Sequence, residues 1–79
     1  MLNKIIDEFN LKIEMVEENN KVTFIGELLK DNKRLEYCVI RNLPNDEDTK
    51  LIYDILVENE VFPNHFYNII DDFYYSRLK

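Results

Sequence analysis

The sequence has few of the residues on which small secreted or catalytic proteins depend. Its single cysteine, Cys38, excludes an internal disulfide and therefore the small secreted domains held together by disulfides. Its single glycine, Gly26, excludes a phosphate-binding loop, which needs several glycines between a strand and a helix. No apolar run is long enough to span a bilayer, and Asp7 and Glu8 stand where a signal peptide needs apolar residues. We therefore expect one small cytoplasmic domain over residues 1–79.

Basic residues are also scarce. The chain has 10 bases against 16 acids, a net charge of −6, which argues against direct binding to nucleic acid or to an anionic membrane. Hydrophobic residues make up 46% of the chain, enough to form a core and to argue against disorder. Asn, Ile, Lys, Tyr and Phe supply 36 of the 79 residues. Their AT-rich codons favour a low-GC bacterium, or one of its phages, as the source.

Apolar spacing predicts one short helix followed by three strands. In residues 2–10 the apolar side chains recur at the intervals of one helical face. From Leu11 the period changes to two, which is typical of strands, and segments rich in Asn at 18–21 and 31–33 predict tight turns. The predicted strands cover residues 11–16, 22–29 and 34–41. Together they form a three-stranded antiparallel meander.

Both faces of this predicted meander carry apolar residues. One face holds Leu11, Ile13 and Met15 of the first strand and Phe24 of the second. The period of two places Leu35, Tyr37 and Val39 of the third strand on the same face. The second face holds Val16, Ile25, Leu29, Cys38 and Ile40. A sheet covered by one helix would leave the second face exposed to solvent, so we expect the C-terminal helices or a partner to cover it.

Two helices are predicted after the strands. The first opens at Asn45 and Asp46, whose side chains can accept hydrogen bonds from the first helical turn, and ends near Asn59. Pro63 then interrupts the chain, and Asn64 can cap a second helix rich in Phe, Tyr and Ile. The predicted fold class is α+β with the order α-β-β-β-α-α.

No constellation of residues predicts catalysis, a cofactor or a metal. His65 is the only histidine, Ser76 the only serine and Cys38 the only cysteine, and none has a partner at productive spacing. We interpret Cys38 as a small apolar residue of the sheet and His65 as a surface or capping residue. The acids from Asp46 to Asp48 lack the glycine and the distal glutamate of a calcium loop, and indicate a helix N-terminus instead.

Charge is unevenly distributed and indicates a candidate binding surface. Residues 45–79 hold 8 acids and 3 bases, whereas residues 1–44 are nearly balanced. The acids lie near tyrosines, which are enriched at protein interfaces. The candidate partner-binding residues are Asp46, Glu47, Asp48, Asp54, Glu58, Glu60, Asp71, Asp72, Tyr67 and Tyr75. The alternative is an ordinary acidic surface that keeps the protein in solution.

The order of the elements and the charge pattern resemble a known group of proteins. The features are the short first helix, the meander ending in LEYCVI at 35–40, the acidic helix opening NDED at 45–48 and the segment FYNIIDDF at 66–73. These are similar to the small acidic type II anti-CRISPR proteins of phages, which block Cas9 by mimicking DNA. The resemblance implies that acids at helix ends and in loops face basic residues that normally hold DNA.

Two functions therefore remain open. The first is a non-enzymatic inhibitor or decoy, encoded by a phage or mobile element, that binds a basic site on a nucleic-acid-handling protein such as a CRISPR effector. The second is a small structural or adaptor protein that buries the second face of the meander and the C-terminal tyrosines in a homodimer.

Overall fold

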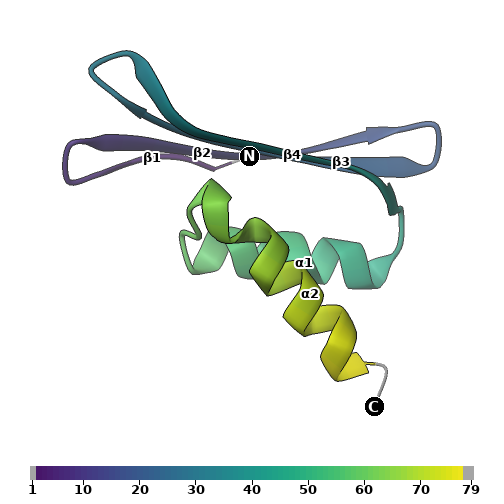
Figure 1. Ribbon diagram of the computed structural model, residues 1–79. Helices are drawn as coiled ribbons and strands as arrows, with labels where there is room; N and C mark the ends of the chain where they lie inside the picture. Colours follow the sequence, from purple (N-terminus) through teal and green to yellow (C-terminus); the bar gives the residue numbers. More distant parts are fainter. Residues whose placement is uncertain (1, 78–79) are drawn as a thin grey trace.

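The computed structural model describes residues 2–77, and the side chains of residues 2–75. Four strands precede two helices, and a short 3-10 turn, η1, comes directly before the second helix (Figure 1). The elements are β1 Leu2–Ile6, β2 Phe9–Glu18, β3 Lys21–Lys30, β4 Lys33–Pro44, α1 Glu47–Glu58, η1 Pro63–His65 and α2 Phe66–Arg77.

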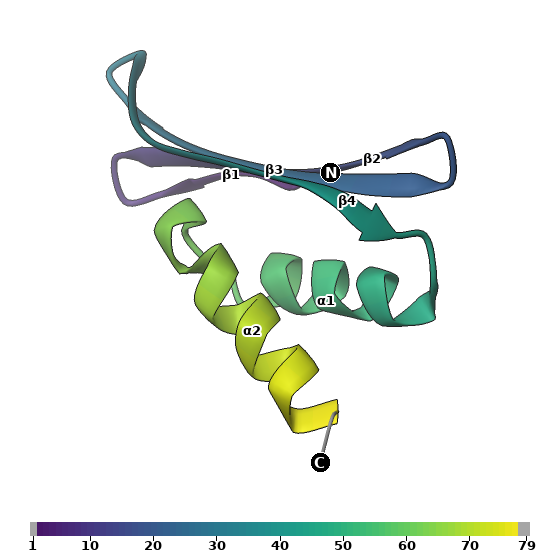
Figure 2. The ribbon, with the colours of Figure 1, turned by 45° about the vertical axis from the view of Figure 1, so that its right-hand side comes forward.

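The strands form one antiparallel sheet in the order β1-β2-β3-β4, so each strand pairs with its neighbour in sequence. Both helices lie on the same side of this sheet, and no helix or strand of residues 2–77 covers the opposite side (Figures 1 and 2). We call the side under the helices the inner face and the opposite side the outer face. The end of α2 lies farthest from the sheet, so this helix projects away from it.

Asparagine and aspartate make the two tight turns that the sequence predicts. Asn19 and Asn20 have φ values of 53° and 62°, and Asp31 and Asn32 have values of 52° and 63°. Two successive positive φ angles define the turn whose twist matches that of the flanking strands, and Asn and Asp tolerate this conformation well. Both turn predictions are confirmed.

The predicted helix over residues 2–10 is wrong, because this segment forms a β-hairpin. Ile6 pairs with Phe9, and Asp7 has a φ of 55° in the intervening turn. A helix of nine residues is marginal by itself, whereas pairing with β2 satisfies the backbone of the whole segment. The strand directs Lys4 to the inner face, where it forms an ion pair with Glu60, a partner 56 residues away. The fold is therefore β-β-β-β-α-α, with four strands instead of three.

Two β-bulges in β4 overturn part of the predicted face assignment. One extra residue stands at Leu35, since Leu28 lies opposite Glu36 while Leu29 lies opposite Arg34. A slip of one residue moves every following side chain to the other face. Cys38 and Ile40 are consequently on the inner face, whereas Tyr37 and Val39 are on the outer face. The second bulge lies at Asn42, whose φ is 64°, and restores the original phase.

The core lies between the inner face and the helices. Its fully buried side chains include Leu11, Ile13, Val22 and Phe24 from the sheet and Ile52, Leu56 and Phe66 from the helical side. Gly26 makes this packing feasible, since a Cβ atom there would lie 2.5 Å from the ring of Phe66 and 3.2 Å from Pro63 Cβ. Two side chains, those of Phe66 and Pro63, thus approach the sheet closely at Gly26.

The two predicted C-terminal helices are confirmed. Asp46 is the N-cap of α1, and its carboxylate accepts a hydrogen bond of 2.9 Å from the Thr49 backbone N–H. Asn59 is the C-cap, and the sequence predicted that the helix ends near this residue. Asn64 lies inside η1 and is not the cap that was predicted for the last helix. Within the described residues, neither helix has the length and apolar character needed to cross a membrane.

Candidate functional site

Three of the predicted binding residues form the acidic start of α1. Asp46 and Glu47 are exposed, Asp48 is half-buried, and all three lie at the helix N-terminus. Carboxylates at this position satisfy unpaired backbone N–H groups and complement the positive end of the helix dipole. These acids have a structural role, so their presence alone does not indicate a binding partner.

Two further acids, Asp54 and Glu58, lie one turn apart on the exposed side of α1. Like charges at this spacing cost a few tenths of a kcal/mol, about 0.2–0.5, in an isolated helix. Neither carboxylate forms an ion pair with any other described residue. Glu60, in the loop that follows, differs from them because Lys4 neutralises it. The structure therefore removes Glu60 from the set of uncompensated acids.

The remaining four predicted residues form one exposed surface on α2, which we call the α2 stripe: Tyr67, Asp71, Asp72 and Tyr75. Tyr67, Asp71 and Tyr75 follow one another at intervals of four residues, so they lie along one side of the helix over about 12 Å. Tyr67 is 56% exposed and Tyr75 is 63% exposed. Asp71 and Asp72 are exposed and have no ion pair with any described residue.

Tyr67 also joins the α2 stripe to the edge of the sheet. Its side chain hydrogen-bonds Cys38 on β4. Burial raises the pKa of the Cys38 thiol, and the hydrogen bond from Tyr67 offsets part of that rise. Cys38 is 8% exposed, which confirms its interpretation as a buried residue of the sheet. Tyr67 thus lies beside β4, while more than half of the residue stays exposed.

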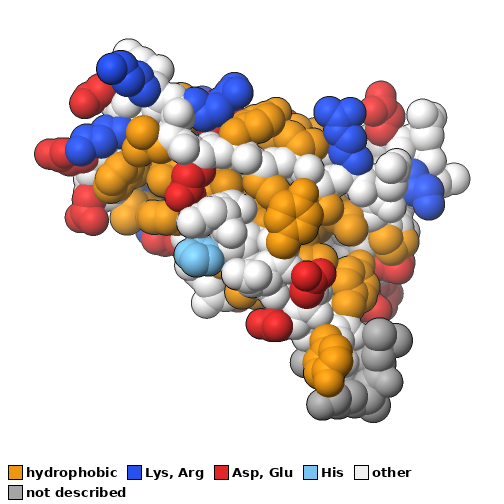
Figure 3. Space-filling model, in the orientation of Figure 1, with side chains coloured by type: hydrophobic (Ala, Val, Ile, Leu, Met, Phe, Trp, Pro, Cys, Tyr) orange, Lys and Arg blue, Asp and Glu red, His pale blue; other side chains and the backbone are white. Residues whose placement is uncertain are grey.

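The fold has two layers that differ in charge: the sheet, β1 to β4, and the helical layer, which consists of α1, η1 and α2. In Figure 3 the visible Lys and Arg side chains lie along the sheet, whereas the visible charged side chains of the helical part are acidic. The ion pairs Lys4–Glu60, Lys30–Glu8 and Arg34–Glu27 each take their base from a strand. Residues 45–79 carry 8 acids and 3 bases, so the helical part of the fold has an excess of negative charge. The structure thus collects the acidic half of the sequence into one layer.

Metal-binding geometry is not found in the described part of the chain. His65 is exposed at the end of η1, as predicted for a surface residue. No three His, Cys, Asp or Glu residues within that part are grouped so that they could hold a metal ion.

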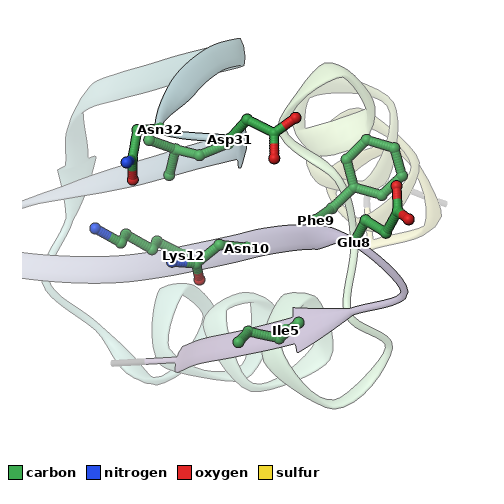
Figure 4. A pocket seen from close by; sticks show the side chains of 8 residues that line it. Ile5, Glu8, Phe9, Asn10, Lys12, Asp31 and Asn32 are labelled. Atoms are coloured by element: carbon green, nitrogen blue, oxygen red, sulfur yellow. The ribbon is translucent and has the colours of Figure 1, made fainter.

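A hollow of about 230 Å³ lies on the outer face at the end of the sheet that carries the Asp7 and Asp31 turns (Figure 4). Ile5, Asn10, Lys12 and Leu29 contribute to its lining, with Glu8 and Asp31 at the side near the turns. Glu8 forms an ion pair of 3.4 Å with Lys30, so this charge is already partly compensated. The hollow is shallow and offers no nucleophile, and it does not suggest a specific ligand.

No family model, no curated protein and no solved structure matches this chain. One feature that carried the resemblance to acidic anti-CRISPR proteins, the short first helix, is replaced by β1. Function therefore has to be inferred from the chemistry of the surface.

Proposed function

We propose that the protein is a non-enzymatic inhibitor that uses its acidic helical layer to bind a basic site on a nucleic-acid-handling protein. The observation that carries this proposal is the set of four exposed carboxylates without ion pairs to other described residues, at Asp54, Glu58, Asp71 and Asp72. A solubility surface needs net charge, but it gains nothing from like charges placed one turn apart.

Such a surface suits a partner that normally binds phosphates. Carboxylates held on helices offer oxygen acceptors at fixed spacing to Lys and Arg side chains, as a nucleic-acid backbone does. The negative field of the helical layer would also accelerate association with a basic channel, most strongly at low salt. The exposed tyrosines of the α2 stripe add apolar area and faces on which Arg can stack.

A CRISPR effector in the bacterial cytoplasm is the specific partner that the anti-CRISPR resemblance suggests. The direct test uses a Cas9–guide RNA complex and fluorescent target DNA. We expect the protein to slow DNA binding by the complex, and to lose this effect as salt rises, because screening weakens contacts between charges. If a hundredfold molar excess of the protein leaves DNA binding unchanged, this effector is not the partner.

The wider proposal is tested by comparing three baits in affinity capture from a low-GC bacterial lysate. The baits are the natural protein, the reversal variant with lysine at Asp54, Glu58, Asp71 and Asp72, and a control. The control, Glu17→Lys with Glu18→Lys, changes exposed acids at the far end of β2. We expect a basic DNA- or RNA-binding protein on the natural and control baits only. Equal recovery on the reversal variant would refute the role of the helical acids.

A second pair of variants distinguishes the effect of the total charge on binding from the effect of where the charges lie. Asp71→Asn with Asp72→Asn and Glu17→Gln with Glu18→Gln both remove two negative charges from exposed sites. We expect the first pair to weaken binding to the captured partner at least tenfold and the second to change it less than twofold. Equal losses would mean that only the overall charge matters.

A further inference from the structure

The outer face of the sheet is apolar at its centre, although none of the described helices and strands covers it. The alternation of the strands directs Val16, Ile25, Leu29, Val39 and Tyr37 to this face. The first four are half-buried by their neighbours in the sheet, and Tyr37 is 51% exposed. Figure 1 shows the sheet edge-on, with both helices below it and no helix above it. A solvated face of an antiparallel sheet is normally polar at these positions.

The charges on this face largely compensate one another. Lys12 lies opposite Glu27, and Arg34 forms an ion pair of 3.5 Å with the same glutamate. The Arg34 guanidinium also stacks over the ring of Tyr37, 4.2 Å from its centroid. With Glu14, Glu18, Lys21 and Arg41 included, the strands direct four bases and three acids to this face. It is therefore close to neutral, unlike the helical layer.

The size of the face is suitable for a stable contact. Four strands spaced about 4.8 Å apart, three of them 10 to 12 residues long, give a projected area on the order of 600 Å². Side chains that interdigitate bury more accessible surface than the projected area. Stable interfaces bury about 800 Å² on each partner, which is close to what the whole face can supply.

We propose that the outer face binds a second copy of this chain, so that two sheets pack face to face as a symmetric dimer. The near-neutral charge permits this contact, because two copies can approach through the outer face without the repulsion that two acidic helical layers would produce. The edge of β4 does not support a continuous sheet across two chains instead. Two bulges, with Arg34 and Arg41 along the strand, interrupt that edge as is usual for edges that resist pairing.

This dimer differs from the one that the sequence indicated. Val16 and Ile25 belong to the contact, but Cys38 and Ile40 lie on the inner face and cannot take part. Tyr67 and Tyr75 are on the helical side and also remain outside it.

The test is sedimentation equilibrium of the natural protein between about 1 µM and 1 mM. We expect a mass twice the 9.6 kDa of one chain at the upper end and dissociation on dilution. The variant Ile25→Lys places a charge at the centre of the outer face and is expected to raise the dimer Kd at least thirtyfold. The control is Leu51→Lys, which makes the same change of charge at a 43% exposed apolar residue of α1.

We expect Leu51→Lys to change the Kd less than threefold. Val39→Thr, which keeps a β-branched side chain in β4, provides a second variant with little risk to the fold, and its Kd should rise as well. Circular dichroism verifies that each variant is folded. A natural protein that stays monomeric at 1 mM overturns the proposal, and so does a dimer that survives in folded Ile25→Lys.

Discussion

Gly26 provides the most direct test of how the helical layer sits on the sheet. Its φ is not positive, so the backbone accepts alanine without strain. From backbone entropy alone, replacing a glycine inside a strand should stabilise the protein by about 0.5–1 kcal/mol. The structure predicts the opposite, because the new Cβ atom would lie 2.5 Å from Cε2 and Cζ of Phe66.

Phe66 cannot easily move away from that contact. Its side chain is fully buried, and Pro63 lies on the same site at 3.2 Å from the added Cβ. Overpacking of this kind costs about 1–3 kcal/mol, so Gly26→Ala should lower the free energy of unfolding even after the backbone gain. For a domain of this size each kcal/mol of lost stability corresponds to a decrease in Tm of roughly 4–8 °C.

The assay is urea unfolding of the natural protein, the two single variants and the double variant with Phe66→Leu. Phe66→Leu alone should destabilise the protein, but it opens space at Gly26. We therefore expect Gly26→Ala to cost at least 1 kcal/mol less in the Phe66→Leu background, since contacting residues are coupled. Stabilisation by Gly26→Ala in the natural background, or additive effects in the double variant, would refute the packing of Phe66 on β3.

Three further predictions concern the cap, one turn and the pH dependence. Asp46→Ala should destabilise the protein by about 0.5–2 kcal/mol in urea unfolding, because the hydrogen bond from the Thr49 N–H is lost. Asp46→Asn keeps an acceptor oxygen and should retain most of the stability. Asn20→Gly should raise Tm, since Asn20 has a φ of 62° at the second position of a turn that favours Asn-Gly; a decrease in Tm would contradict this turn geometry. Burial raises the pKa of Cys38, and burial with the nearby carboxylates of Glu14 and Asp54 raises that of Tyr53, so folding favours both neutral forms. Their contribution is complete below the pKa values of the unfolded chain, roughly 8.5 for Cys and 10 for Tyr, and is lost as pH rises above each of these towards the raised folded value. Unfolding measured over this range should show stability falling with pH, and Cys38→Ala should reduce the slope.

Local chemistry made part of the fold predictable from sequence. Asn19 and Asn20 specify a tight turn without any information about distant residues, and the period of two from Leu11 to Met15 identifies a strand and its buried side. The start of α1 was predictable for the same reason, because Asp46 and Thr49 are only three residues apart.

Tertiary pairing explains why other parts were not predictable. The apolar residues from Leu2 to Phe9 fit a helical period, and Lys4 looked like a residue of the solvent side. Its partner Glu60 is remote in sequence, so only the folded chain shows that Lys4 faces inward. No glycine marks the position of the bulge at Leu35 in the sequence. The bulge moves every following side chain up to Ile40 to the face opposite to the predicted one. For the candidate site, the helical period placed Asp71 and Tyr75 correctly on one side, but it could not show that Glu60 is neutralised.

The two proposed surfaces are compatible with each other, and salt distinguishes them. In a dimer joined by the outer faces, the sheets would be about 10 Å apart and the helical layers would point in opposite directions. Since each helix is about 10 Å across, the two acidic layers would be separated by roughly 30 Å, several times the Debye length of about 8 Å at physiological salt. Their mutual repulsion would then be screened, and each α2 stripe would remain accessible for a basic partner. Added salt should weaken binding to that partner, whereas it should leave the near-neutral contact between the two sheets unchanged or strengthen it.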